Sequence, residues 1–302
     1  MTGIFIYNAA VPTLLALISD VFFSVQVQAA AGRLGWDFVN IERVDQVAPQ
    51  PPLAGQESSP TSAQNSPVGH NFIALVVEMA PVLIVVELAS PTLPWEQWII
   101  AAKTSPATRR VPVLGFGPHV DAALRQRATA AGCDAVVTQG QFTARLIDLL
   151  QAHARLPDVA ALRAAADGDL SELAWHGIEL FNRGEYFEAH EELEHAWNAE
   201  TSPARDLYQG LLQVAVAYLH ITRRNYNGAI KMFLRARQWL DPLPDVSRGV
   251  DVAGLRQDAA AARAALEALG ADKMAEFDVT ALKPVRVANG PRGNPQRAAG
   301  PP

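Results

Sequence analysis

Five short runs rich in apolar residues, each followed by a segment with helical spacing, fill the first half of this 302-residue chain. The clearest run is PVLIVVEL at 81–88, which has no charged residue before Glu87. A continuous apolar strand has to be covered on both faces, as in a parallel sheet between two layers of helices. The predicted strands are 14–19, 37–44, 81–88, 111–115 and 135–138, and the predicted helices are 22–34, 71–79, 95–103, 119–131 and 142–154.

After Pro157 the pattern becomes purely helical. The predicted helices are 159–183, which Gly168 could divide, 186–200, a helix that starts at Ser202-Pro203 and runs to about 223, 225–240 and 252–269. We therefore expect an α/β domain over 1–155 and a helical bundle over 156–280. Residues 46–70 are rich in Pro, Ser, Gln and Gly and predict a disordered insertion, and residues 281–302 predict a disordered basic tail.

The composition excludes several classes of protein. Apolar residues make up 49% of the chain and the net charge is −6, which argues against a protein dominated by contacts with nucleic-acid phosphates. The single cysteine, Cys133, excludes an intramolecular disulfide framework and a multi-cysteine zinc site. Residues 9–31 are apolar, but Asp20 interrupts them and no Lys or Arg precedes Arg33, which fits neither a secretory signal nor a spanning helix. We expect a soluble cytoplasmic protein with no membrane and no nucleic acid as partner.

The first half resembles the receiver domain of two-component response regulators over roughly residues 12–154, which implies a doubly wound, flavodoxin/CheY-like sheet of five parallel strands. In this resemblance Glu87 stands where the phospho-accepting Asp would end the third strand, and Ser19-Asp20 is all that remains of the acidic cluster. Gln139 replaces the Lys and Gly140 the Pro that follows it, and the Ser/Thr switch position falls near Gly117.

These departures remove the groups that phosphotransfer needs. An Asp nucleophile, acids that hold Mg²⁺ and a Lys that neutralises the acyl phosphate are the required set. One reading is a phosphorylatable switch. The favoured reading is a fold kept for protein contacts, with a protein partner or a homodimer formed through this domain. Cys133 has no neighbouring His or Lys in the sequence, so we expect an ordinary buried thiol.

Polar side chains line up along one face of the predicted helix 186–200. With about 100° per residue, His190, Glu191 and Glu194 share a face with Phe187 and Trp197. The adjoining face is mostly apolar. The stripe therefore predicts a polar cluster beside the core of the helical domain.

The next helix carries a matching stripe on an otherwise apolar surface. Its members fall within about 80° of one another and are Arg205, Gln209, Gln213 and His220. A helix that is apolar almost all round is buried, and polar groups on it must find partners because unsatisfied ones are costly. We expect Glu191 and Glu194 to pair with Arg205, and the glutamines to join this cluster.

Residues 181–240 resemble the family called "domain of unknown function 309", through the pattern F-N-x-G-x-Y-x-E-A-H-E-x-L-E-x-x-W followed by R-x-x-x-Q-G-L-x-Q, a later His and N-x-x-G-A. The resemblance implies a small all-helical domain, and some members carry the label of metal-dependent hydrolase. The matching residues are Phe181, Asn182, Gly184, Tyr186, Glu188, Ala189, His190, Glu191, Leu193, Glu194, Trp197, Arg205, Gln209, Gly210, Leu211, Gln213, His220, Asn225, Gly228 and Ala229.

Three interpretations of the two stripes stay open. His190-Glu191-x-x-Glu194 is similar to half of the H-E-x-x-H zinc motif, with His220 as a third ligand and Glu191 either as a ligand or as the base that activates water. A His with two carboxylates would also suit Mn²⁺ or Fe²⁺. The second interpretation is a hydrogen-bonded network between helices, and the third is a pocket for an anionic or polar small ligand at Arg205.

The sequence thus predicts a two-domain regulatory or protein-interaction protein whose receiver-like domain is not phosphorylated. The alternative is a metal-dependent hydrolase with a divalent Zn, Mn or Fe cofactor that uses His190, Glu191, Glu194 and His220.

Overall fold

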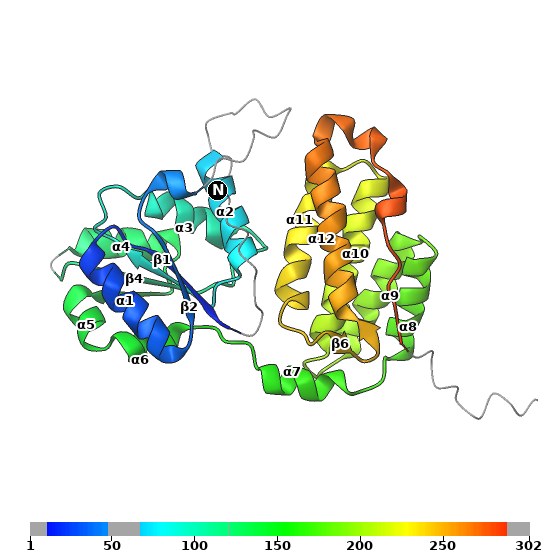
Figure 1. Ribbon diagram of the computed structural model, residues 1–302, viewed down its shortest axis with the longest axis horizontal. Coiled ribbons are helices and arrows are strands. Elements are labelled where there is room, and N and C mark those ends of the chain that lie inside the picture. Colours follow the sequence, from blue (N-terminus) through cyan, green and yellow to red (C-terminus); the bar gives the residue numbers. More distant parts are fainter. Residues whose placement is uncertain (1–10, 48–66, 120, 289–302) are drawn as a thin grey trace, which may run out of the picture. The chain divides into compact units, whose positions relative to one another are not determined.

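The computed structural model describes residues 11–47, 67–119 and 121–288 (Figure 1). The chain divides into two compact units, Met1–Pro157 and Asp158–Pro302. Within the described ranges, no helix has the length and hydrophobicity that crossing a membrane requires.

A five-stranded parallel sheet forms the centre of the first unit, in the order β2-β1-β3-β4-β5. β1 pairs with both β2 and β3, so the direction of winding reverses there. This order is that of the flavodoxin-like and receiver folds, and the predicted doubly wound sheet is confirmed. The strands are β1 (Thr13–Leu17), β2 (Asp37–Ile41), β3 (Leu83–Glu87), β4 (Val113–Gly117) and β5 (Ala135–Thr138).

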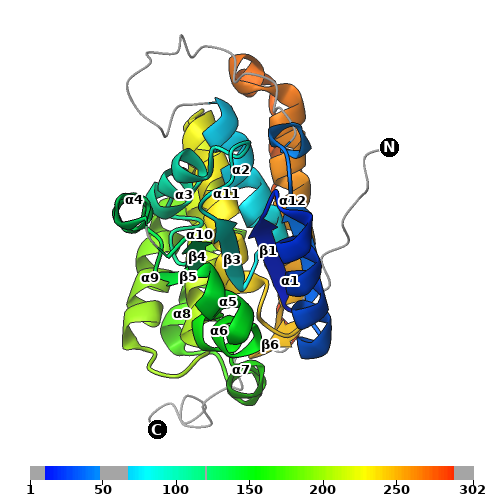
Figure 2. The same ribbon diagram turned by 90° about the vertical axis from the view of Figure 1, so that its left-hand side faces the viewer.

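Helices cover both faces of this sheet (Figures 1 and 2). Leu14 and Ala16 of β1 face one layer, and Leu15 and Leu17 face the other, because side chains alternate along a strand. The first layer contains α1 (Val21–Leu34), α5 (Gln139–Ala144) and α6 (Leu146–His153). The second contains α2 (Pro67–Met79), α3 (Trp95–Thr104) and α4 (Ala122–Ala131).

Three elements of this unit differ from the prediction. The helix expected over 142–154 is two helices, because Arg145, with φ of −129°, leaves the helical conformation between α5 and α6. Helix α2 begins at Pro67 instead of residue 71, with proline at the first helical position, where its missing N–H is tolerated. A short 3-10 helix, η1 (Val44–Gln46), follows β2. Residues 48–66 of the predicted insertion lie outside the described residues.

The second unit is a bundle of helices, as predicted. Its central helix is α10, which packs against α9 and α11 and is buried on most sides. Gly210 makes the close approach to α11 possible, because a Cβ at this position would collide with the side chain of Leu240. The helices are α7 (Val159–Ala166), α8 (Glu172–Asn182), α9 (Tyr186–Ala199), α10 (Arg205–Thr222), α11 (Tyr226–Leu240) and α12 (Val252–Leu269).

A small antiparallel hairpin, which the sequence pattern did not predict, lies between α11 and α12. Its strands are β6 (Val246–Ser247) and β7 (Val250–Asp251). The two turn residues, Arg248 and Gly249, have φ of 49° and 80°. Two residues in the left-handed region form the kind of turn that matches the twist of a two-residue hairpin.

The prediction of a disordered tail from residue 281 is wrong for residues 281–288. Ala281 ends the 3-10 helix η4 (Val279–Ala281), which follows the 3-10 helix η3 (Ala271–Glu276). The Asn182 amide donates to the Val285 carbonyl oxygen (2.9 Å), and its oxygen accepts from the Val285 N–H (2.7 Å). Val285 is buried, and Val287 bridges to Val250. The apolar residues within this basic segment therefore attach it to the bundle. Residues 289–302 lie outside the described residues.

Candidate functional site

Glu87 ends β3 at the carboxyl edge of the sheet, beside the switch point where ligands bind in this class of fold. The side chain is buried. Its oxygen Oε2 accepts hydrogen bonds from the Ser19 N–H (2.8 Å), the Asp20 N–H (3.0 Å) and the Ser19 hydroxyl (3.0 Å). The Ser19 hydroxyl also lies 2.8 Å from that of Ser90. The carboxylate therefore ties β3 to the loop between β1 and α1.

The other receiver-like positions lie at the ends of helices and strands. The Asp20 carboxylate accepts from the Phe22 N–H (2.8 Å) and caps α1. Gln139 is the first residue of α5, directly after the capping residue Thr138. Gly117 is the last residue of β4.

Cys133 is buried in the core of the first unit. Burial raises the pKa of its thiol to about 12, with a further contribution from Asp134 and an opposing one from Lys103. Lys103 itself donates to the Asp134 carboxylate (2.6 Å) and the Val111 carbonyl (2.8 Å). The thiol is thus protonated at neutral pH, as expected for a structural cysteine.

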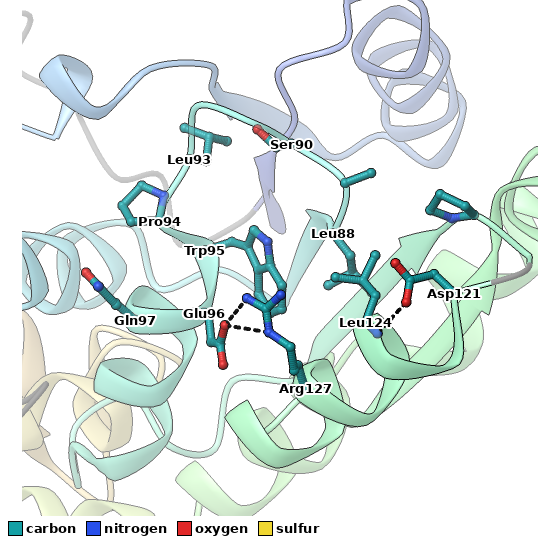
Figure 3. Close-up of a pocket in the computed structure, with 12 residues that line it drawn as sticks. Leu88, Ser90, Leu93, Pro94, Trp95, Glu96, Gln97, Asp121, Leu124 and Arg127 are labelled. Carbon is teal, nitrogen blue, oxygen red and sulfur yellow. Dashed lines mark hydrogen bonds and ion pairs between the residues drawn. The ribbon is translucent and has the colours of Figure 1, made fainter.

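A pocket of about 440 Å³ opens between the loop after β3 and helix α4 (Figure 3). Leu88, Leu93 and Leu124 contribute apolar lining. Arg127 forms an ion pair with Glu96 and lies over the ring of Trp95, at 5.9 Å from its centroid. The Asp121 carboxylate accepts from the Leu124 N–H (2.7 Å). The charged side chains Glu96, Asp121 and Arg127 of this pocket therefore have partners within the protein. No sequence pattern predicted the pocket.

The polar stripe of α9 lies at the surface, contrary to the prediction that it faces the next helix. Glu191 and Glu194 are exposed. His190 is half-buried, with Nε2 3.8 Å from the Glu194 carboxylate and Nδ1 buried without a hydrogen-bond partner. The face of α9 that packs in the core is the adjoining row of Ala189, Leu193 and Ala196. The two alanines of this row let α9 approach its neighbours closely, and Leu193 fills the core between them.

Arg205 does not pair with the glutamates as predicted. It is exposed, and its guanidinium lies over the ring of Trp197, at 5.1 Å from the centroid. Within the described residues, no ion pair joins Arg205 to Glu191 or Glu194. The guanidinium is held at the start of α10 by a cation–π contact.

Gln209 and Gln213 are buried on α10, and the Oε1 atom of each has no hydrogen-bond partner. Nδ1 of His220 lies 3.1 Å from the side-chain amide of Asn225, which caps α11. Burial lowers the pKa of His220, and the charge of Arg223 lowers it further. His220 is therefore neutral at physiological pH and serves the turn between α10 and α11.

The metal donors predicted from the sequence are not brought together. Among the described residues, no group of three or more His, Cys, Asp or Glu side chains is placed to hold a metal ion. This holds for the predicted set of His190, Glu194 and His220, and for the predicted base Glu191. The donor geometry therefore does not fit a metal centre of a hydrolase.

Arg248, which the sequence pattern did not single out, joins several segments of the second unit. Its guanidinium donates to the Glu200 carboxylate (2.6 Å), the Tyr208 hydroxyl (2.7 Å) and the Ser202 hydroxyl (3.3 Å). It also donates to the Ala165 carbonyl (3.3 Å). These partners come from α7, α10 and the loop between α9 and α10. The one available signal was the Arg-Gly pair of the hairpin turn.

The first unit is similar in fold to solved response regulators. These include the chemotaxis response regulator CheY4 of Vibrio cholerae (12% identity, 47% of this chain and 98% of that chain, TM-score 0.35). They also include the response regulator RPA3017 of R. palustris (14%, 49% and 99%, TM-score 0.34) and the phosphorylated cyanobacterial phytochrome response regulator RcpA (11%, 47% and 90%, TM-score 0.34).

A comparison with curated proteins gave no match. The second unit matches a family model, from Ala174 in α8 through α9 and α10 to Met232 in α11. This segment contains the two polar stripes and Asn182, whose side chain forms hydrogen bonds with the backbone of Val285. The family that residues 174–232 match is the domain of unknown function DUF309.

Proposed function

We propose that the receiver-like unit is a protein-interaction module that regulates by binding and is not switched by phosphorylation. The observation that supports this proposal is the hydrogen bonding of Glu87. In the position of the phospho-accepting residue, its carboxylate holds the loop after β1 in place.

Phosphotransfer to a carboxylate needs acids that bind a divalent metal and a cation near the acyl phosphate. Oε2 of Glu87 already accepts three hydrogen bonds, and Asp20 uses its carboxylate to cap α1. The residue in the position of the Lys is the neutral Gln139. With these side chains the unit would keep one conformation and present a constant surface to its partners.

For the helical unit we propose the same class of role. Its conspicuous polar groups support the structure: Arg248 joins several segments, Asn182 holds the C-terminal segment and Arg205 covers Trp197. No specific observation favours turnover of a substrate.

The test is to incubate the full chain with Mg²⁺ and a small-molecule phosphodonor, and to follow its intact mass. A phosphorylatable response regulator, treated in parallel, is the positive control. We expect no phosphoryl group on this protein under conditions that modify the control. A phosphoryl group mapped to Glu87 by peptide analysis, and absent from Glu87→Gln, would refute the proposal.

A further inference from the structure

Residues 282–288, the C-terminal segment of the helical unit, run along the bundle as an extended stretch, drawn in red in Figure 1. Asn182 of α8 binds both backbone groups of Val285. Its amide donates to the Val285 carbonyl oxygen (2.9 Å), and its oxygen accepts from the Val285 N–H (2.7 Å). Residues that face each other in antiparallel strands exchange the same pair of bonds. The Asn182 side chain therefore binds the segment as a neighbouring strand would.

The opposite edge of the segment pairs with the hairpin strand β7. The Asp251 N–H donates to the Arg286 carbonyl oxygen (3.0 Å). The Ala288 N–H donates to the Gly249 carbonyl oxygen (2.8 Å). These two bonds flank an antiparallel bridge between β7 and the segment. The segment thus adds a strand to the two-stranded sheet, which is a common way for a domain to bind an extended peptide.

Val285 is the apolar anchor of the segment. Its side chain is buried in the hydrophobic core of the bundle. Val287 lies on the same face of the extended chain and packs against this core, but it is only half-buried. The exposed residues of the segment are Lys283, Pro284, Arg286 and Ala288. Backbone hydrogen bonds and one buried side chain hold the segment, so its release would uncover little apolar surface of its own.

Arg286 is read by two carboxylates. Its Nε lies 2.9 Å from the Asp251 carboxylate, and its Nη1 lies 3.0 Å from the Asp258 carboxylate. The guanidinium lies across the first turn of α12, where a Cβ at Gly254 would collide with it. The surface therefore has a place for a planar cation beside the buried valine.

We propose that this surface binds an extended segment of a partner protein with the sequence apolar–Arg–apolar, and that residues 282–288 compete for it in cis. The segment-binding surface consists of Asn182, Gly249–Asp251, Gly254 and Asp258. It supplies backbone hydrogen bonds on both edges of the bound strand, a core position for the first apolar side chain and two carboxylates for the arginine.

The cis segment sets a threshold for this partner. A tethered segment has an effective concentration of about 1 mM, so a partner in trans has to bind more tightly than the tethered copy at that concentration. This inference rests on the proposed function, because it specifies the partner that the helical unit would bind as an interaction module.

The test uses the full chain and a fluorescent peptide with the sequence of residues 282–288, and it measures binding by anisotropy. Val285→Asp in the protein places a carboxylate at the core position and should release the cis segment. The peptide should bind this variant at least about tenfold more tightly than the wild type, whose own segment competes. Arg286→Ala removes two partly exposed ion pairs, leaves the core intact and should raise the affinity in the same direction. It replaces Val285→Asp if circular dichroism shows that Val285→Asp is unfolded.

Two comparisons decide whether the peptide occupies the proposed surface. Asn182→Ala, added to the variant with the released segment, removes both bonds to the anchor valine and should weaken binding about tenfold or more. Asn198→Ala changes an exposed asparagine on α9, is the matched control and should leave the affinity unchanged. A peptide with Arg286→Glu would meet the two aspartates and should bind at least about tenfold more weakly.

Three results would overturn the inference. One is that the peptide binds neither Val285→Asp nor Arg286→Ala. Another is binding that Asn182→Ala does not weaken. The third is a wild-type dimer, measured by sedimentation equilibrium, that Val285→Asp dissociates, because the occupant would then be the segment of a second copy. None of these results would bring a phosphoryl group onto Glu87, so failure of this inference is distinguishable from failure of the proposed function.

Discussion

Replacement of Arg248 by Ala should lower the free energy of unfolding of the helical unit by about 3 kcal/mol, because it leaves the partners of a largely buried ion pair without their donor. The side chains of Arg248 and Glu200 are only 12% and 16% exposed. The Tyr208 hydroxyl accepts a hydrogen bond from Arg248 and loses it in this variant. Denaturant unfolding, with hydrogen exchange to identify the unit that opens, measures the effect.

Two further substitutions separate the contribution of the Arg248 hydrogen bonds to stability from that of the backbone conformation at residue 248. Arg248 has a positive φ, which costs a non-glycine residue about 1 kcal/mol. Arg248→Gly should therefore recover about 1 kcal/mol relative to Arg248→Ala, and most of the loss should remain. Arg183→Ala, which removes an exposed ion pair with Glu185, should cost less than about 1 kcal/mol. An Arg248→Ala protein as stable as Arg183→Ala would show that the network contributes no net stability.

Replacement of Glu87 by Ala should lower the free energy of unfolding of the receiver-like unit by about 2 to 3 kcal/mol, because the N–H groups of Ser19 and Asp20 lose a charged acceptor. Equilibrium unfolding of this unit is the measurement, and hydrogen exchange at the loop between β1 and α1 should rise in parallel.

The conservative variants make this prediction specific. All three hydrogen bonds converge on one oxygen of Glu87, so the amide oxygen of Glu87→Gln can accept them and should retain about half of the stabilisation. Glu87→Asp is one methylene shorter and should behave more like Glu87→Ala. If Glu87→Asp were as stable as the wild type, the reach of the carboxylate would not matter, and the structural role of Glu87 would be wrong.

The sheet was predictable because each strand is a short run of mostly apolar residues that can be recognised without knowledge of distant parts of the chain. The run before Glu87 is apolar at consecutive positions, and only a strand covered on both faces accepts that pattern. The ends of the strands were less predictable. β4 begins at Val113, two residues later than expected, because Pro112 has no N–H to donate to a neighbouring strand.

The candidate site was harder to predict, because helical periodicity gives angles and not the direction of the core. On α9 the aromatic side chains of Phe187 and Trp197 suggested a face beside the core, yet Phe187 is 42% exposed and the row that begins at Ala189 is buried. Small residues contribute little to a hydrophobic pattern but permit close packing. The expected pairing of Arg205 with Glu191 and Glu194 was wrong because α9 turns the row with Ala189 toward the core and leaves both glutamates exposed.

Contacts between distant residues left no periodic signal. Arg248 meets partners that lie 40 to 83 positions earlier in the chain. The Asn182 amide meets Val285 across 103 positions. Asn182 was identified by its resemblance to a family pattern, but its role as a clamp on the C-terminal segment follows only from the fold.

The most direct test of a receiver fold without receiver chemistry is an NMR titration of the Ser19 and Asp20 amides with Mg²⁺ and beryllofluoride, which mimics an acyl phosphate. If Glu87 holds these amides permanently, their resonances should stay in place at every concentration, while a phosphorylatable response regulator responds under the same conditions. A saturable shift of both resonances that requires Mg²⁺ and disappears in Glu87→Gln would contradict the structural role of Glu87 and restore the phosphorylation switch.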